Sequence, residues 1–256
     1  MDTQHVRMSL TVCGLACSLL LPMLPGPAGA QGNDLLLYSP FDGSNGAAFS
    51  RGEGSNLGDR GPQFSEGIRG QAISLQSDCI YALRDNFDPQ SGTVALWVRP
   101  HWEGNDPAGH YLFCIYGRRD LEHSWSVNRW SVYCGGGQCT FAIFSETEGQ
   151  TFSINAPIGG WKAGEWHHVA VEWAGVNGGA GAGRMSLFLD GKQVATLKDR
   201  DIRVGPTDEA IGIGRDQDGS PDYAEADLDD LFIYRGELAV EDIAACVAQI
   251  TSGTAY

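Results

Sequence analysis

The chain has 256 residues, a formal net charge of −15 at pH 7 and a sequence pI near 4.6. An acidic surface of this kind repels phosphate groups, so the composition disfavours nucleic acids and anionic membrane surfaces as partners. It is compatible with calcium or neutral sugars, although acidity also serves simply to keep an exported protein in solution.

The first 30 residues have the pattern of a secretory signal peptide. A basic start precedes the short apolar run 10–24, and Ala28-Gly29-Ala30 offers the small residues of a cleavage site. We therefore expect residues 1–30 to be removed, and residues 31–256 to form one domain that is secreted, periplasmic or otherwise at the cell exterior. No later run is apolar for long enough to span a bilayer, so we expect no membrane insertion.

Short runs with period-two alternation or β-branched and aromatic residues occupy most of the chain after residue 31, separated by glycine-rich turns. Asp190-Gly191 predicts a tight hairpin turn, and the apolar spacing over 237–250 predicts one helix. The pattern predicts an all-β fold, a two-sheet antiparallel β-sandwich of jelly-roll type with a short C-terminal helix. The predicted strands are 35–38, 71–75, 80–83, 93–99, 111–116, 130–133, 140–145, 151–155, 166–173, 185–189, 193–196, 210–214 and 227–234.

Cysteines of an exported protein are candidates for disulfides. Cys134 and Cys139 flank four residues of a predicted hairpin and form a plausible clasp with a chain-entropy gain of about 2 kcal/mol; a pair of Cys79 and Cys114 would gain about 4 kcal/mol. We predict both pairs, which leaves Cys246 as a thiol in the helix.

Adjacent histidines at 167 and 168 invite the hypothesis of a metal or acid–base site. Neighbouring side chains on a strand point to opposite faces, so His167 and His168 cannot chelate one ion together. We expect both to have structural roles.

Several segments, in order, resemble the laminin-G-like domains of the concanavalin A-like lectin/glucanase superfamily. The first strand with its FDG turn, a W-x-x-G-x-WHHVA strand, a D-G-K hairpin and a terminal DD strand all have counterparts in that family. The resemblance implies a sandwich in which the first and last strands pair, and it leaves lectins, adhesion modules and glycosidases open as functions. The matching segments are "LLLYSPFDGSNG" (35–46), "SGTVALWVRP" (91–100), "WKAGEWHHVAVEW" (161–173), "MSLFLDGKQVAT" (185–196), "AIGIGR" (210–215) and "LDDLFIYRGELAVEDI" (228–243).

The same resemblance implies a structural calcium ion, because several members of the family hold Ca²⁺ beside the FDG turn and the DD strand. Asp42, the Gly43 carbonyl and Asp229 could supply part of the six to eight oxygens that calcium requires. The alternative is that these acids cap turns or face solvent.

Glu225, Asp227 and Asp229 alternate along one predicted strand, so their carboxylates share a face. Glycosidases on the same sandwich use paired acids of similar spacing, which makes a glycoside hydrolase or polysaccharide lyase the alternative function. Retaining chemistry needs carboxyl groups about 5 Å apart, and positions four residues apart on a flat strand do not reach that distance.

Carbohydrate binding requires aromatic faces together with polar groups that fix sugar hydroxyls. Residues of this kind are present in or beside the loops that match no family motif, and we predict that they frame a ligand site: Trp102, His123, Trp125, Asn128 and Trp130. The sequence thus favours a non-catalytic module that recognises a glycan or an extracellular protein, with an adhesion scaffold without a small-ligand site as a further alternative.

Overall fold

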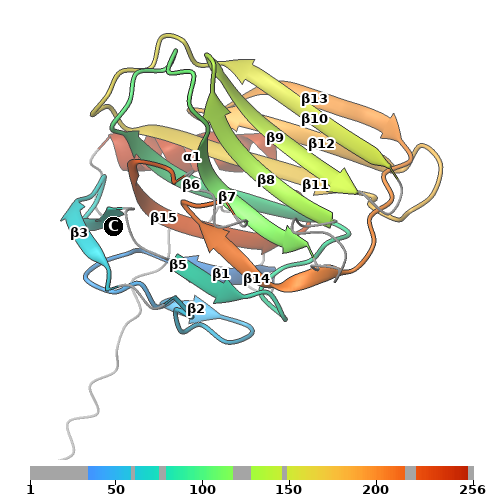
Figure 1. The fold of residues 1–256 in the computed structure, drawn as a ribbon, viewed down its shortest axis with the longest axis horizontal. Coiled ribbons are helices and arrows are strands. Elements are labelled where there is room, and N and C mark those ends of the chain that lie inside the picture. The colour runs from blue at the N-terminus through green and yellow to red at the C-terminus, as the bar shows by residue number, and fades with distance from the viewer. Residues whose placement is uncertain are drawn as a thin grey trace, which may run out of the picture.

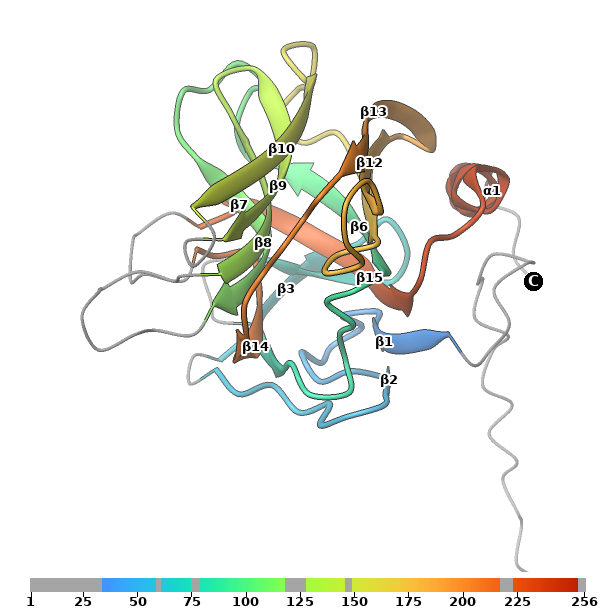
Figure 2. The ribbon, with the colours of Figure 1, turned by 90° about the vertical axis from the view of Figure 1, so that its right-hand side faces the viewer.

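The computed structural model describes residues 34–58, 61–74, 79–117, 128–145, 149–216 and 223–252. The predicted signal peptide lies outside these ranges. Within them, two antiparallel sheets pack face to face, and one helix lies outside this pair (Figure 1; Figure 2).

The larger sheet holds nine of the described strands and contains both ends of the domain. Its central strands are β6, β15 and β11, and β15 pairs with β1, as the family resemblance predicts. Strand β4 pairs with both β15 and β3. In order the sheet reads β13 (Lys192–Arg200), β12 (Gly183–Leu189), β11 (His167–Ala174), β6 (Gly92–Pro100), β15 (Ala226–Arg235), β1 (Leu35–Ser39) and β2 (Phe49–Ser50), with β4 (Gln71–Ser74) and β3 (Gln63–Glu66) beside β15.

The smaller sheet has six described strands and forms the second layer. It contains the β8–β9 hairpin, in which Cys134 lies opposite Cys139. In order it reads β10 (Gln150–Pro157), β9 (Gln138–Ser145), β8 (Asn128–Gly135), β7 (His110–Gly117), β14 (Thr207–Ile213) and β5 (Cys79–Ala82).

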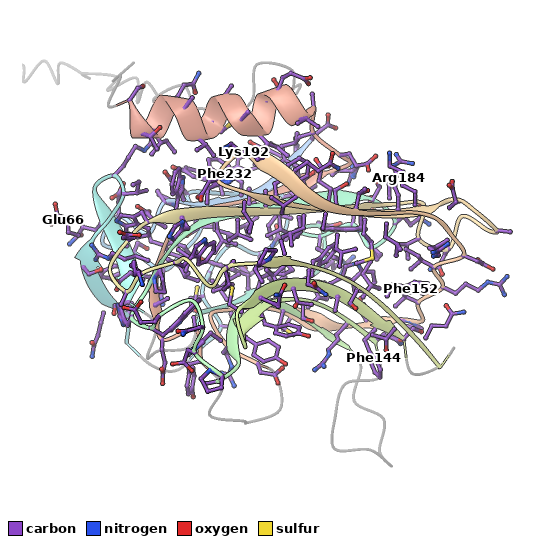
Figure 3. The ribbon with its side chains drawn as sticks, turned by 90° about the horizontal axis from the view of Figure 1, so that it is seen from above. Glu66, Phe144, Phe152, Arg184, Lys192 and Phe232 are labelled. Carbon is purple, nitrogen blue, oxygen red and sulfur yellow. The ribbon has the colours of Figure 1, made fainter. Side chains whose placement is uncertain are left out.

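Alternating side chains from both sheets fill the space between the layers. In β6, Val94, Leu96 and Val98 point into this core, and in the other sheet Trp130 and Phe141 do the same, all nearly or fully buried. Figure 3 shows Phe152 between the layers and Phe144 on the outer side of the six-stranded sheet.

Helix α1 (Val240–Thr251) covers the outer face of the nine-stranded sheet (Figure 3). Its one buried residue, Ile243, packs on Ala95, Ala170 and Phe188. Strand β11 is therefore buried on both faces for most of its length. No helix among the described residues is long and apolar enough to cross a membrane.

The predicted all-β sandwich with a C-terminal helix is confirmed, and each predicted strand overlaps an observed one. The hairpin at Asp190-Gly191 has positive φ at both residues, 49° and 76°, as a two-residue turn requires. Strands β2 and β3 were not predicted.

The predicted Cys79–Cys114 disulfide is wrong. Cys79 lies opposite Ile213 and Cys114 opposite Gly212, so strand β14 separates them. Two strand spacings place their Cα atoms about 10 Å apart, beyond the reach of a disulfide. Cys134 and Cys139 are directly opposite but hold thiols in this structure, so that pairing stays a prediction.

Candidate functional site

Three of the predicted ligand-binding residues are buried in the protein. Trp130 is fully buried in the core and meets Phe87 edge-to-face at 5.5 Å, and Asn128 donates to the Pro206 carbonyl at 3.0 Å. The Trp102 indole donates to the Ala224 carbonyl at 2.8 Å. The prediction that these three frame a ligand face is therefore wrong, because all three side chains are buried inside the fold. His123 and Trp125 lie outside the described residues.

Trp102 belongs to a ladder of aromatic rings at one end of the sandwich. His110 stacks on Trp102 at 4.4 Å, Trp102 lies 6.4 Å from Trp161, and Trp161 stacks on His167 at 4.1 Å. His167 also contacts Asp190 through Nδ1 at 3.1 Å. The imidazole ring of His167 thus has a structural role, packed against Trp161.

The His168 side chain points to the opposite face of the nine-stranded sheet from His167. Its ring meets Trp97 edge-on at 5.2 Å beneath helix α1, and its backbone N–H donates to Asp190 at 2.9 Å. Burial lowers the pKa of His168 to about 4, which keeps the imidazole neutral at physiological pH. The two adjacent histidines do not form one site.

The predicted calcium residues gather around the turn between β3 and β4. Asp42 Oδ1 accepts the backbone N–H of Gln71 at 2.7 Å. Asp229 Oδ2 accepts the N–H groups of Ile68 and Arg69 at 2.9 and 3.3 Å, and its Oδ1 accepts that of Asp230 at 2.8 Å. Burial and the neighbouring Asp230 charge raise the pKa of Asp229 to about 8, against the opposing effect of these N–H donors.

In this arrangement the carboxylates hold the turn by accepting its N–H groups, which fits the contacts better than a calcium coordination shell does. Calcium needs oxygen atoms with free lone pairs, whereas both lone pairs of Asp229 Oδ2 already accept N–H groups. Among the described residues, no group of three or more His, Cys, Asp or Glu side chains is arranged to hold a metal ion. Gly43, the third predicted ligand, has positive φ in the FDG turn and donates its N–H to the Phe41 carbonyl at 2.9 Å.

Of the acidic series, Asp227 and Asp229 lie on β15, whereas Glu225 precedes the strand with a positive φ of 44°. Asp227 is held by Arg99 at 2.9 Å and His101 at 3.0 Å. Burial acts to raise the pKa of Asp227, but hydrogen bonds from His101 and Arg99 outweigh it and lower the pKa overall. Asp227 is therefore a fixed anion, while Glu225 is exposed and precedes the strand.

A different face carries the residue types that bind sugars. Along β7 to β10, residues that point to the outer face of the six-stranded sheet alternate with residues that point into the core. Tyr111, Tyr133 and Thr140 form one row across the strands; Arg129, Phe144 and Thr151 form another. Between these rows lie small side chains: Cys114, Ser131, Ala142 and Ser153.

The two tyrosines form a stacked pair on this face. Tyr111 and Tyr133 are cross-strand partners, with ring centroids 5.2 Å apart and planes inclined by 28°. Both rings are half-buried. Burial and the negative charge of Asp216 raise the pKa of Tyr111 to about 12, so its hydroxyl stays protonated and able to donate.

Arg129 supplies a charged group beside the tyrosine pair. Its guanidinium lies 5.7 Å from the Phe144 ring centroid and 3.8 Å from Asp216. Both contacts hold the arginine side chain above the sheet, where it remains partly exposed. The face thus combines aromatic rings with a planar guanidinium donor, groups that recognise sugar rings and hydroxyls, while the buried Asp216 positions the guanidinium.

A groove of about 660 Å³ lies elsewhere, beside the edge strand β5. Glu53, Arg84 and Asp85 line it together with the half-exposed Leu57. Its described lining contains no aromatic ring, so it offers no surface for stacking a sugar.

Several solved structures of known proteins are similar to this chain in fold. The binding domain of botulinum neurotoxin serotype D has a TM-score of 0.64 at 15% identity, covering 84% of this chain and 51% of that one. The same domain in complex with N-acetylneuraminic acid gives 0.63 at 15% identity, with the same shares covered. The binding domain of Paraclostridial Mosquitocidal Protein 1 gives 0.58 at 14%, covering 84% and 52%.

At these identities the similarity establishes the fold alone, and this chain spans about half the length of those structures. No curated protein sequence matches the chain. A model of laminin-G-like domains, described as the concanavalin A-like lectin/glucanases superfamily, matches residues 76–244. The chain therefore belongs to the laminin-G-like family of that superfamily.

Proposed function

We propose that this chain is an exported, non-catalytic recognition module that binds a glycan through the outer face of the six-stranded sheet. The observation that carries the proposal is the stacked pair Tyr111–Tyr133 beside Arg129 and Asp216. Aromatic rings pack against the C–H faces of sugars, while the partly exposed Arg129 guanidinium can bind hydroxyl groups in pairs and the buried Asp216 holds it in place. The signal-peptide pattern in residues 1–30 supports export.

Proteins of the same fold support glycans as the ligand class. One neurotoxin binding domain is described in complex with SialylT and another in complex with N-acetylneuraminic acid, and the cell entry of botulinum neurotoxin type C is described as dependent on interaction with two ganglioside molecules. The net charge of −15 favours a neutral glycan for this chain over an anionic one, because the overall field repels negative ligands.

The geometry gives less support to the hydrolase alternative. Asp227 is paired with Arg99 and His101, and Asp229 accepts three backbone N–H groups, so neither is placed to receive or donate a proton to a substrate. The alternatives are an extracellular protein as ligand and an adhesion scaffold without a small ligand. Both are compatible with the same sandwich, but they give the aromatic face no role.

The test is a glycan array probed with residues 31–256, followed by calorimetric titration of the strongest hit. Tyr133→Ala removes one ring of the stacked pair, and Arg129→Met removes the guanidinium but keeps the length of the side chain. We expect each to weaken binding about tenfold, since one aromatic contact contributes about 0.5–1.5 kcal/mol beyond its buried area.

Arg184→Met is the matched control, because this arginine lies on β12 of the other sheet and pairs with Glu237. It should bind like the wild type. Melting curves of all variants check that the fold is intact. Equal binding by Tyr133→Ala, Arg129→Met and the wild type would disprove the proposed face, and an array without hits would favour a protein ligand.

A further inference from the structure

The turn of residues 67–70 between β3 and β4 lies against three carboxylates at the junction of the first and last strands. Asp42 follows β1, and Asp229 and Asp230 lie within β15. The turn presents the N–H groups of Ile68 and Arg69 to Asp229, and the next residue presents its N–H to Asp42. Backbone donors therefore face Asp42 and Asp229 on the side of the turn.

The turn also delivers a positive charge. Arg69 Nε lies 3.2 Å from Asp230 Oδ2, and this aspartate is almost fully buried. The opposite oxygen, Oδ1, accepts the Tyr38 hydroxyl at 2.8 Å. Arg69 is thus the cation that compensates Asp230, and the Tyr38 hydroxyl satisfies the other side of the carboxylate.

Glycines at both ends of the turn make this close approach possible. A Cβ at Gly67 would lie 2.4 Å from the Arg69 carbonyl oxygen and 2.5 Å from Asp229 Oδ2; one at Gly70 would lie 2.0 Å from Asp42 Oδ1. Gly70 also has a φ of +54°, which favours glycine. A side chain at Gly67 would push the turn off the carboxylates.

We propose that this turn takes the place of the calcium ion that the family resemblance implies, with the Arg69 guanidinium as a built-in cation and backbone N–H groups in place of metal bonds. The domain would then join its first and last strands without a divalent metal. Ca²⁺ requires oxygen ligands with open lone pairs, whereas Asp42 Oδ1 and both oxygens of Asp229 accept backbone N–H groups, and the charge of Asp230 is met by Arg69. This inference is independent of what the domain binds.

The experiment compares the melting temperature of the wild type in excess EDTA and in millimolar calcium chloride, together with direct calcium titration by calorimetry. We expect no shift and no binding at the Asp42–Asp229 position. Arg69→Gln should lower the melting temperature by about 5–10 °C, because it leaves the buried Asp230 without its counter-charge. Arg69→Lys should recover much of that loss, since it restores the positive charge.

Arg84→Gln is the control, because Arg84 is 92% exposed and its loss should not shift the melting temperature. A calcium-induced rise in the wild-type melting temperature that disappears in Asp42→Asn would overturn the proposal. So would an Arg69→Gln variant that melts like the wild type. The wild-type measurement decides the calcium question even if a variant fails to fold.

Discussion

A buried glutamate on β11 gives the sharpest test of how this sandwich responds to pH. Glu172 lies on the outer face of the nine-stranded sheet and is only 4% exposed. Its Oε1 accepts the backbone N–H of Leu238, at 2.8 Å, and the Thr93 hydroxyl, at 3.4 Å. Burial raises the pKa of Glu172 from 4.5 to about 7.

The sign and size of the effect follow from that pKa. Between pH 4.5 and 7 the folded state binds a proton at Glu172 that the unfolded state has lost, so the free energy of unfolding falls as pH rises. Above pH 7 the cost of the buried charge is fully present. The difference between the two pKa values corresponds to about 3 kcal/mol as an upper limit.

Glu172→Gln removes the charge and keeps an acceptor oxygen for Leu238. We expect the variant to be more stable than the wild type by about 2–3 kcal/mol near pH 8, and about equally stable near pH 5. Urea unfolding at the two pH values measures the difference, with Glu241→Gln on the exposed side of α1 as the control. A stability difference of the same size at both pH values would refute the reasoning.

Three further results are expected. Trp130→Ala should lower the free energy of unfolding by about 3–5 kcal/mol in urea, because it empties a fully buried core position; a loss below about 1 kcal/mol would place this ring outside the core. Oxidised glutathione should convert Cys134 and Cys139 to a disulfide, passing two electrons and two protons to form two reduced glutathiones. A thiol assay of the unfolded product then counts two fewer thiols than before oxidation, and an unchanged count would contradict the pairing. NMR titration should show His168 neutral down to about pH 4; because its folded pKa is lowered by burial, stability falls as pH drops from 6.5 through 4, and an ordinary histidine pKa would contradict this.

The strands could be predicted because most of them follow one rule. In β6 and β11 every second side chain is apolar and faces the core, as in Val94, Leu96 and Val169, and this period is visible in the sequence. Strand β3 (Gln63–Glu66) has only Phe64 as an apolar residue, and β2 has two residues, so neither gives a periodic signal. Their pairing depends on neighbours that the rest of the fold supplies.

The sequence prediction chose the right strand for the candidate site but the wrong residues, one position away from the outward-facing one. The prediction chose Asn128 and Trp130 for their chemistry, although the alternation of β8 turns both toward the interior. The residue between them, Arg129, faces outward, and Tyr133 lies four positions further on the same face. Applying the period of two to "NRWSVYC" would have identified these outward positions. The partner of Tyr133, Tyr111, comes from another strand and could be assigned only from the register of the sheet.

The two outer faces of the sandwich differ in what their polar groups already contact, and this difference supports the ligand face that we propose. On the nine-stranded sheet, Asp227 binds Arg99, Asp230 binds Arg69, and helix α1 covers Ala95 and its neighbours. An enzyme working there would first have to break ion pairs whose buried partners would be left uncompensated, at a cost of about 3–5 kcal/mol for each pair. On the six-stranded sheet the aromatic rings and Arg129 stay partly exposed, and sugar stacking requires no rearrangement of the core. Recognition by the six-stranded sheet is therefore the reading that requires the least reorganisation of the folded protein.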